Sequence, residues 1–188
     1  MPAVRTIAAV LVAATIAVTG CAIYSSRDQP TQRTDPTTPV DRQAPIYAAV
    51  LRQYLTSGDA SFGGQRFPRI FVLDHAVASV GAPEQPAAGG GSVPAADRQA
   101  ITRALSDVGP VSFVDSADAV IVDRDGCAHV RDRGILITLG PVDGVGDQVR
   151  VAVSGYVACL GASSLTYRVQ QASGAWRVAG VAAWGPVS

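Results

Sequence analysis

Three residues of this chain are candidates for acid–base catalysis. Asp74 and His75 follow the apolar run Ile70–Leu73, and His129 lies in the stretch VDRDGCAHVRDRG (122–134). A carboxylate and an imidazole can act as general acid and general base. Neighbouring residues of a strand point to opposite faces, so Asp74 and His75 are not expected to meet as a dyad. We therefore predict no catalytic residue, and these three remain candidates only if the protein is an enzyme.

The residues that the chain lacks exclude several common kinds of active site. There is no lysine, which excludes a P-loop, a lysine Schiff base and a Ser-x-x-Lys nucleophile pair. The only glutamate, Glu84, lies in a Pro- and Gly-rich stretch, so hydrolysis by paired carboxylates would depend on aspartate alone. The segment GASSL, residues 161–165, lacks the second glycine of a nucleophile elbow. Most common enzyme signatures are therefore missing.

The aspartates around His129 are spaced like part of a calcium loop. Asp123, Asp125 and Gly126 would occupy positions 3, 5 and 6 of an EF-hand, with Asp132 at position 12. Position 1 would then be Ile121, which offers no ligand oxygen, and position 12 would lack its bidentate glutamate. We therefore predict a solvated loop here, and no metal or other cofactor.

The N-terminus has the organisation of an export signal. Arg5 is the only charge before position 27, and Ile7–Val18 is an unbroken run of Ile, Ala, Val, Leu and Thr. A basic start, an apolar core of roughly 7–15 residues and a small-residue exit define a secretory signal peptide. A spanning helix needs about 20 apolar residues, so this run is short for one. We assign residues 1–20 to a signal peptide.

The exit of this signal reads Val18-Thr19-Gly20-Cys21. It resembles the lipobox of bacterial lipoproteins, in which an aliphatic residue and two small residues precede an invariant cysteine. The resemblance implies that Cys21 receives a diacylglyceryl group, that cleavage follows Gly20, and that the lipid bilayer holds the protein at the extracytoplasmic face of the cell membrane. The alternative is an ordinary signal peptide with a chance cysteine. The lack of lysine and the abundance of Ala, Val and Gly resemble proteins of high-GC actinobacteria.

Two cysteines remain once Cys21 is assigned to lipidation. Cys127 and Cys159 form an even pair in an exported chain, where oxidising conditions favour disulfides. A bond between them would close a loop of about 30 residues and stabilise the fold by about 3.5–4 kcal/mol in the chain-entropy model. The alternatives are two buried free thiols or a metal pair. The chain has no Cys-x-x-Cys spacing and only two histidines, which argues against a metal site at these cysteines.

The exported chain divides into a tether and one domain. Residues 21–44 are rich in Pro, Thr, Gln, Asp and Arg and lack an apolar period, so we expect a disordered tether. Residues 45–188 suffice for a single globular domain. The whole chain has 15 basic and 15 acidic residues, and this balance argues against nucleic acid as a partner.

The apolar pattern predicts an α+β domain with two N-terminal helices packed on a mainly antiparallel sheet. One helix is expected from Pro45, as its first residue, to Ser57-Gly58, and a second from Pro94 to about Asp107. The stretch between them, GAPEQPAAGGGSVP (81–94), predicts a flexible loop. Early strands are expected at Ile70–Leu73, Val111–Val114 and Val120–Val122.

Four alternating runs then predict a C-terminal antiparallel meander with one apolar face that the helices cover. These runs are Ile135–Leu139, Val149–Ser154, Leu165–Gln170 and Trp176–Ala179. Around a turn at Ser173-Gly174, we expect Gln171 to face Trp176, Gln170 to face Arg177, Val169 to face Val178 and Tyr167 to face Gly180. The stretch YRVQQASGAWRVAG (167–180) resembles the last hairpin of cystatin-like and NTF2-like curled sheets.

Arginines from three strands coincide on the polar face of the predicted meander. Arg150, Arg168 and Arg177 share this face with Tyr156, Ser154 and Gln170. Guanidinium groups bind phosphate and carboxylate through paired hydrogen bonds. The set is therefore a candidate surface for an anionic envelope polymer or an envelope protein, and the alternative is an ordinary solvent-exposed sheet face.

These patterns favour a non-catalytic binding or accessory module of the bacterial cell envelope, anchored through Cys21. The main alternative is a small lyase, isomerase or hydrolase that uses Asp74, His75 or His129 in a pocket between the helices and the sheet. A third possibility is a purely structural envelope component. An enclosed apolar pocket with an inward-facing Asp or His would favour the enzyme, and a flat or convex sheet with scattered polar residues would favour the binding module.

The lipobox resemblance predicts the effect of one substitution. Cys21→Ser removes the thiol that would be acylated, so the protein should be released from membranes into the medium or persist as an unprocessed precursor. Fractionation of cells followed by mass measurement of the N-terminus checks both outcomes. Unchanged membrane retention with normal processing would contradict lipidation at Cys21.

Overall fold

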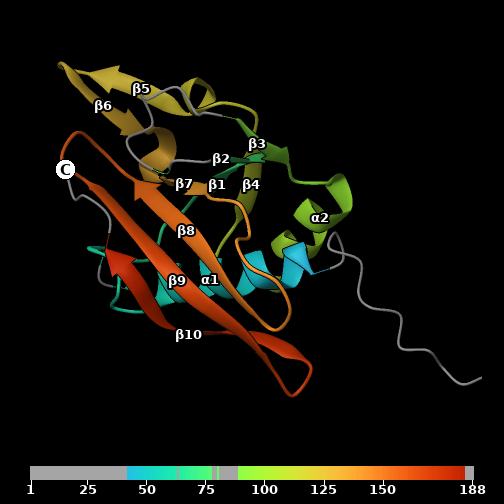
Figure 1. Ribbon diagram of the computed structural model, residues 1–188. Helices are drawn as coiled ribbons and strands as arrows, with labels where there is room; N and C mark the ends of the chain where they lie inside the picture. Colours follow the sequence, from blue (N-terminus) through green and yellow to red (C-terminus); the bar gives the residue numbers. More distant parts are fainter. Residues whose placement is uncertain (1–41, 63, 78–79, 81–88, 185–188) are drawn as a thin grey trace, which may run out of the picture. The chain divides into compact units, whose positions relative to one another are not determined.

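The computed structural model describes residues 42–62, 64–77, 80 and 89–184 (Figure 1). Its class is α+β, as the sequence predicted, with two α-helices and a mixed sheet. The sheet has six strands in the order β10-β9-β8-β7-β1-β4, and β2–β3 and β5–β6 form separate pairs. The elements are α1 (Gln43–Thr56), β1 (Ile70–Leu73), β2 (His75–Val77), β3 (Gly89–Ser92), α2 (Ala95–Ala104), β4 (Val111–Val114), β5 (Ile121–Arg124), β6 (Cys127–Val130), β7 (Ile135–Leu139), β8 (Gln148–Tyr156), β9 (Ala162–Ala172) and β10 (Ala175–Trp184).

Helix α1 packs against β8, β9 and β10 (Figure 1). Its apolar residues recur every three to four positions, which gives the helix one buried face. The helix begins at Gln43, so the prediction that Pro45 is its first residue was wrong. Proline is tolerated at the third position because the amides of the first turn have no partner within the helix. The buried residues are Ala44, Ile46, Tyr47, Val50, Leu51, Tyr54 and Leu55.

Helix α2 begins after Pro94 and ends at Ala104, earlier than the expected Asp107. Ile101 and Leu105 are fully buried in the same core as α1. The helix contacts α1 and β4, so it extends the helical layer away from the long C-terminal strands.

Strand β1, which lies next to the edge strand β4, has parallel neighbours on both sides. It pairs with β4 on one side and with β7 on the other. All four of its residues are buried, as expected for a parallel strand that is covered on both faces. Ile70 and Val72 enter the core under the helices, whereas Phe71 and Leu73 enter a second core on the opposite face.

Strands β7, β8, β9 and β10 are neighbours in the order of the chain, and each pair is antiparallel. In the last hairpin Gln171 faces Trp176, Gln170 faces Arg177 and Val169 faces Val178, as expected. The expected pairing of Tyr167 with Gly180 was wrong, because the register shifts between Val178 and Gly180 and Tyr167 faces Val181. A bulge adds one residue to a strand, and hydrophobic alternation alone does not reveal it.

The second core lies under the β5–β6 hairpin. Val120 and Val130 meet Phe71, Leu136 and Tyr156 there. The hairpin turns at Asp125-Gly126, whose φ angles of 57° and 77° are those of a type I′ turn. The predicted disulfide between Cys127 and Cys159 is present, with Cα atoms 5.5 Å apart, and it ties β6 to the turn between β8 and β9.

Part of the stretch predicted as a flexible loop is a strand. Residues 89–92 form β3, which pairs with β2. Its composition is almost all glycine, so the sequence carries no side-chain signal for a strand. Residues 81–88 of the predicted loop, including Glu84, lie outside the described residues.

The predicted signal peptide, residues 1–20, also lies outside the described part of the chain, as do Cys21 and residues 22–41 of the tether. Within the described residues, neither helix has the length and apolar character needed to cross a membrane.

Gly155 of β8 lies directly against Tyr54 of α1. A Cβ atom at this glycine would stand 2.7 Å from the Tyr54 hydroxyl oxygen and 2.9 Å from Cδ1 of Ile135. The same hydroxyl donates a hydrogen bond of 2.6 Å to the carbonyl oxygen of Ser163, and burial raises the pKa of Tyr54. The contact leaves no room for a side chain at position 155.

Gly155→Ala should therefore lower the free energy of unfolding by about 1–3 kcal/mol, the usual cost of overpacking a core. Gly58→Ala is a matched control, because a Cβ atom there would have no neighbour within 4 Å. Urea unfolding of both variants measures the difference. An equal loss in both, or no loss at Gly155, would show that α1 is not packed as described.

Candidate functional site

A groove runs between α1 and β10. Its volume is about 1250 Å³, the largest of the four hollows that we describe. Large, mostly apolar hollows are the usual places for ligands. We call it the α1–β10 groove; it is lined by Arg42, Pro45, Ala48, Ala49, Arg52, Gln53, Ala104, Val145, Gly146, Asp147, Gln171, Gly174, Ala175, Trp176, Arg177 and Val178.

The groove exists because the outer face of α1 carries small side chains. Ile46, Tyr47 and Val50 point into the core, whereas Ala48 and Ala49 are half-buried on the groove side. Trp176 and Val178 of β10 are also half-buried and supply apolar surface. Val145 lines the groove too and is 86% exposed.

Three arginines line the groove, and two of them already have partners. Arg42 donates to the carbonyl oxygens of Gly144 and Gly146, at 3.0 and 3.1 Å. Arg52 is paired with Asp107. Arg177 borders the groove from the edge strand β10, where it alternates with Trp176 and Val178, so its side chain leaves the strand on the other face. Within the described residues that side chain forms no hydrogen bond or ion pair.

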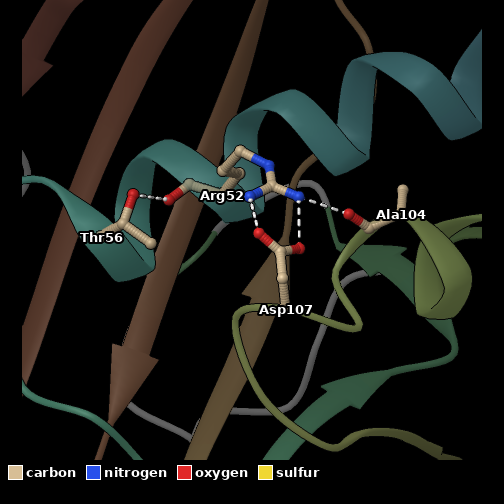
Figure 2. A network of polar contacts seen from close by, with 4 residues as sticks. All are labelled: Arg52, Thr56, Ala104 and Asp107. Atoms are coloured by element: carbon tan, nitrogen blue, oxygen red, sulfur yellow. Dashed lines mark hydrogen bonds and ion pairs between the residues drawn. The ribbon is translucent and has the colours of Figure 1, made fainter.

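Arg52 joins α1 to the segment that follows α2 (Figure 2). Its guanidinium donates two bonds to the Asp107 carboxylate, at 2.7 and 2.8 Å, and one to the carbonyl of Ala104. The hydrogen bonds from Arg52 lower the pKa of Asp107 to about 2. Arg52 therefore acts as a structural clamp along the groove.

Only two of the three arginines of the predicted surface lie together. Arg150 and Arg168 are exposed and directly opposite each other on β8 and β9, where they line a smaller hollow of about 380 Å³. Arg177 lies opposite Gln170 on β10, the edge strand, and borders the α1–β10 groove.

Tyr156 does not belong to that surface. Its exposed fraction is 5%, and its hydroxyl donates a 2.7 Å bond to the carbonyl of Ala128. Tyr156 lies on the same face of β8 as Arg150, but the β5–β6 hairpin covers that end of the sheet. Strand alternation predicts the face on which a side chain lies. Whether that side chain is exposed depends also on which distant segment packs over it.

Asp74 and His75 do meet, contrary to the prediction. The Asp74 carboxylate lies 3.1 Å from Nδ1 of His75 and 3.0 Å from the guanidinium of Arg98. Asp74 stands in a bend between β1 and β2, so strand alternation does not separate it from His75. Neither residue lines any of the four hollows that we describe.

The remaining sequence candidates lie on the β5–β6 hairpin. Nδ1 of His129 lies 3.3 Å from the carbonyl oxygen of Cys127, and the side chain is half-buried. The Asp123 carboxylate accepts a bond from the amide of Gly126 and so stabilises the turn. Among the residues that the structure describes, no cluster of three His, Cys, Asp or Glu could hold a metal ion.

No known protein family, curated protein or solved structure matches this chain. The resemblance of its last hairpin to cystatin-like and NTF2-like sheets therefore stays a prediction.

The α1–β10 groove was not predicted from the sequence. The apolar pattern of α1 marks its buried face, whereas the groove uses the small residues Ala48 and Ala49 on the other side. The available signal was Trp176, a large aromatic residue on a strand with few bulky neighbours. The pairing of Arg52 with Asp107 spans 55 positions and left no local pattern.

The clamp predicts a pH-dependent effect of Arg52→Gln on stability. The folded pKa of Asp107, about 2, lies below its unfolded value of about 3.9. Such a group stabilises the fold fully above the unfolded pKa and loses this contribution as pH falls through the folded pKa. The stability difference between wild type and Arg52→Gln should therefore shrink between about pH 4 and pH 2.

Unfolding by urea at several pH values measures this difference. The effect should be small, because the two side chains are 44% and 67% exposed. Arg103→Gln on the exposed side of α2 is the control and should show no such pH dependence. A difference between wild type and Arg52→Gln that stays constant down to pH 2 would contradict the clamp.

Proposed function

We propose that this chain is a lipid-anchored binding module of the bacterial cell envelope without catalytic activity. The observation that carries the proposal is the composition of the α1–β10 groove. Its lining is mostly apolar and is bordered by Arg177 at the edge of the sheet, and neither Asp74 nor His75 nor His129 contributes to it. A groove of this kind can bind a ligand but has no acid–base pair with which to transform one.

The lining favours a ligand that carries both an apolar group and a negative charge. Ala48, Ala49 and Trp176 would contact the apolar part, and the long side chain of Arg177 would turn around the edge strand to pair with the anion. Addition of a partner strand along β10 is disfavoured, because register shifts after Val178 and after Val181 interrupt this edge. An anionic envelope polymer with apolar substituents, or an acidic side chain beside an apolar one on an envelope protein, has this chemistry.

The proposed location rests on the Val18-Thr19-Gly20-Cys21 sequence alone. Acylation of Cys21 would place the domain at the extracytoplasmic face of the membrane, joined by residues 22–41. There the groove would face envelope components and not cytoplasmic metabolites.

The second candidate function is a small acid–base enzyme, and one observation favours it. The Asp74 carboxylate orients the His75 imidazole at 3.1 Å, as an acid–base pair requires. Arg98 competes for the same carboxylate at 3.0 Å. We rank this function second because the pair lies outside the α1–β10 groove.

Anilinonaphthalene sulfonate, an apolar anion, is a suitable probe of the groove. The fluorescence of this dye should rise when it binds to the folded protein, and the rise should saturate as expected for a single site. Ala48→Glu places bulk and negative charge in the groove and should weaken binding at least tenfold, about 1.4 kcal/mol. Arg177→Gln should weaken it severalfold, because a charge-assisted hydrogen bond is lost.

Ala119→Glu is the matched control, since Ala119 is exposed and does not line the groove. It should bind the probe like the wild type. Near-UV circular dichroism establishes that each variant keeps its packing. Binding that is not saturable, or that Ala48→Glu leaves unchanged, would contradict a ligand site in the groove.

A further inference from the structure

Another hollow lies beside the β5–β6 hairpin. Its volume is about 770 Å³, and three arginines from different segments converge on it. Arg69 precedes β1, Arg124 ends β5, and Arg133 lies in the turn before β7. We call it the arginine hollow; it is lined by Pro68, Arg69, Arg124, His129, Val130, Asp132 and Arg133.

The charges in the arginine hollow are not balanced. Asp132 is its only acidic residue, and that carboxylate lies 4.0 Å from a further arginine, Arg131. Within the described residues Arg69, Arg124 and Arg133 form no ion pair or hydrogen bond through their side chains. Three unpaired guanidiniums around one space repel one another, in a chain whose net charge is zero. An anion in the hollow would remove this repulsion.

Backbone hydrogen bonds fix the segments that carry Arg69 and Arg133. The carbonyl of Arg69 accepts the amide of Ile135 at 3.0 Å, which fixes it beside β7. Asp132 and Arg133 have φ angles of 57° and 54°, a conformation that costs free energy for residues other than glycine. The backbone amide of Arg131 donates a hydrogen bond of 2.8 Å to the carbonyl oxygen of Val120, and this bond stabilises the turn.

The hairpin fixes the remaining residues of the hollow. Arg124 and His129 lie on one face of the hairpin, because His129 pairs with Val122, two residues before Arg124. The Cys127–Cys159 disulfide and the bridge between His129 and Ala158 tie the hairpin to the turn between β8 and β9. The backbone of the site is therefore fixed before an anion binds, and binding has to order only the arginine side chains.

We propose that the arginine hollow binds a phosphate group. A tetrahedral phosphate offers several acceptor oxygens, and guanidinium groups bind them in pairs. Three guanidiniums with one carboxylate suit a doubly charged phosphate better than a single carboxylate ligand. The phosphate could be that of a soluble phosphate or of an anionic lipid headgroup, and the site is separate from the α1–β10 groove.

The test uses the disulfide-bonded protein, labelled with ¹⁵N and titrated with inorganic phosphate. Side-chain Nε–H signals of Arg69, Arg124 and Arg133 should shift in a saturable manner. Arg69→Gln and Arg124→Gln should each weaken binding about tenfold, and neither alters the left-handed backbone at residues 132 and 133. Arg103→Gln, an equal loss of charge on exposed α2, should leave binding unchanged within twofold.

A second arm separates the two sources of phosphate. Vesicles of phosphatidylglycerol, compared with vesicles of phosphatidylcholine, test the anionic headgroup. Binding to phosphatidylglycerol that Arg69→Gln and Arg124→Gln weaken, without a response to inorganic phosphate, assigns the site to a lipid. The proposal would be overturned if neither arm gave a saturable response. It would also be overturned if Arg103→Gln weakened binding as much as Arg69→Gln and Arg124→Gln do.

Discussion

The structure depends on the packing of α1 against the long antiparallel strands. Two tyrosines of the helix make this contact specific: the Tyr47 hydroxyl donates to the carbonyl of Gly140 at 3.0 Å, and the Tyr54 hydroxyl donates to that of Ser163 at 2.6 Å. One bond lies just beyond the end of β7 and the other near the start of β9. A buried hydroxyl without its acceptor would cost about 1–3 kcal/mol, so these bonds fix where the helix sits along the sheet.

Both proposed sites follow from how the two sheet faces are covered. On one face α1 directs its large side chains inward, and Ala48 and Ala49 leave the α1–β10 groove at the edge of the sheet. On the other face the β5–β6 hairpin covers only one end, where the arginine hollow forms beside it. The groove has a mostly apolar lining with Arg177 at its border, whereas three arginines line the hollow, which has little apolar surface. The two sites therefore suit ligands of different chemistry.

The sequence predicted what depends on local periodicity and missed what depends on long-range contacts. The alternation in β9 and β10 predicted the pairing of Val169 with Val178, but it could not reveal the bulge that follows. The even pair Cys127 and Cys159 predicted the disulfide. Burial of Tyr156, and the meeting of Asp74 with His75 in a bend, depend on segments that no local pattern connects. Both groove and hollow combine residues from several elements, so spacing along the chain does not show them.

Native-state hydrogen exchange tests the central claim, that α1 is an integral part of the sheet core and so holds the groove open. The amides of Val50, Leu51 and Tyr54 should exchange only through global unfolding, with the same free energy as amides of β8 and β9. That free energy should equal the value from urea unfolding. Exchange of the α1 amides at a clearly lower free energy, while β8 and β9 stay protected, would contradict this account of the fold and of its groove.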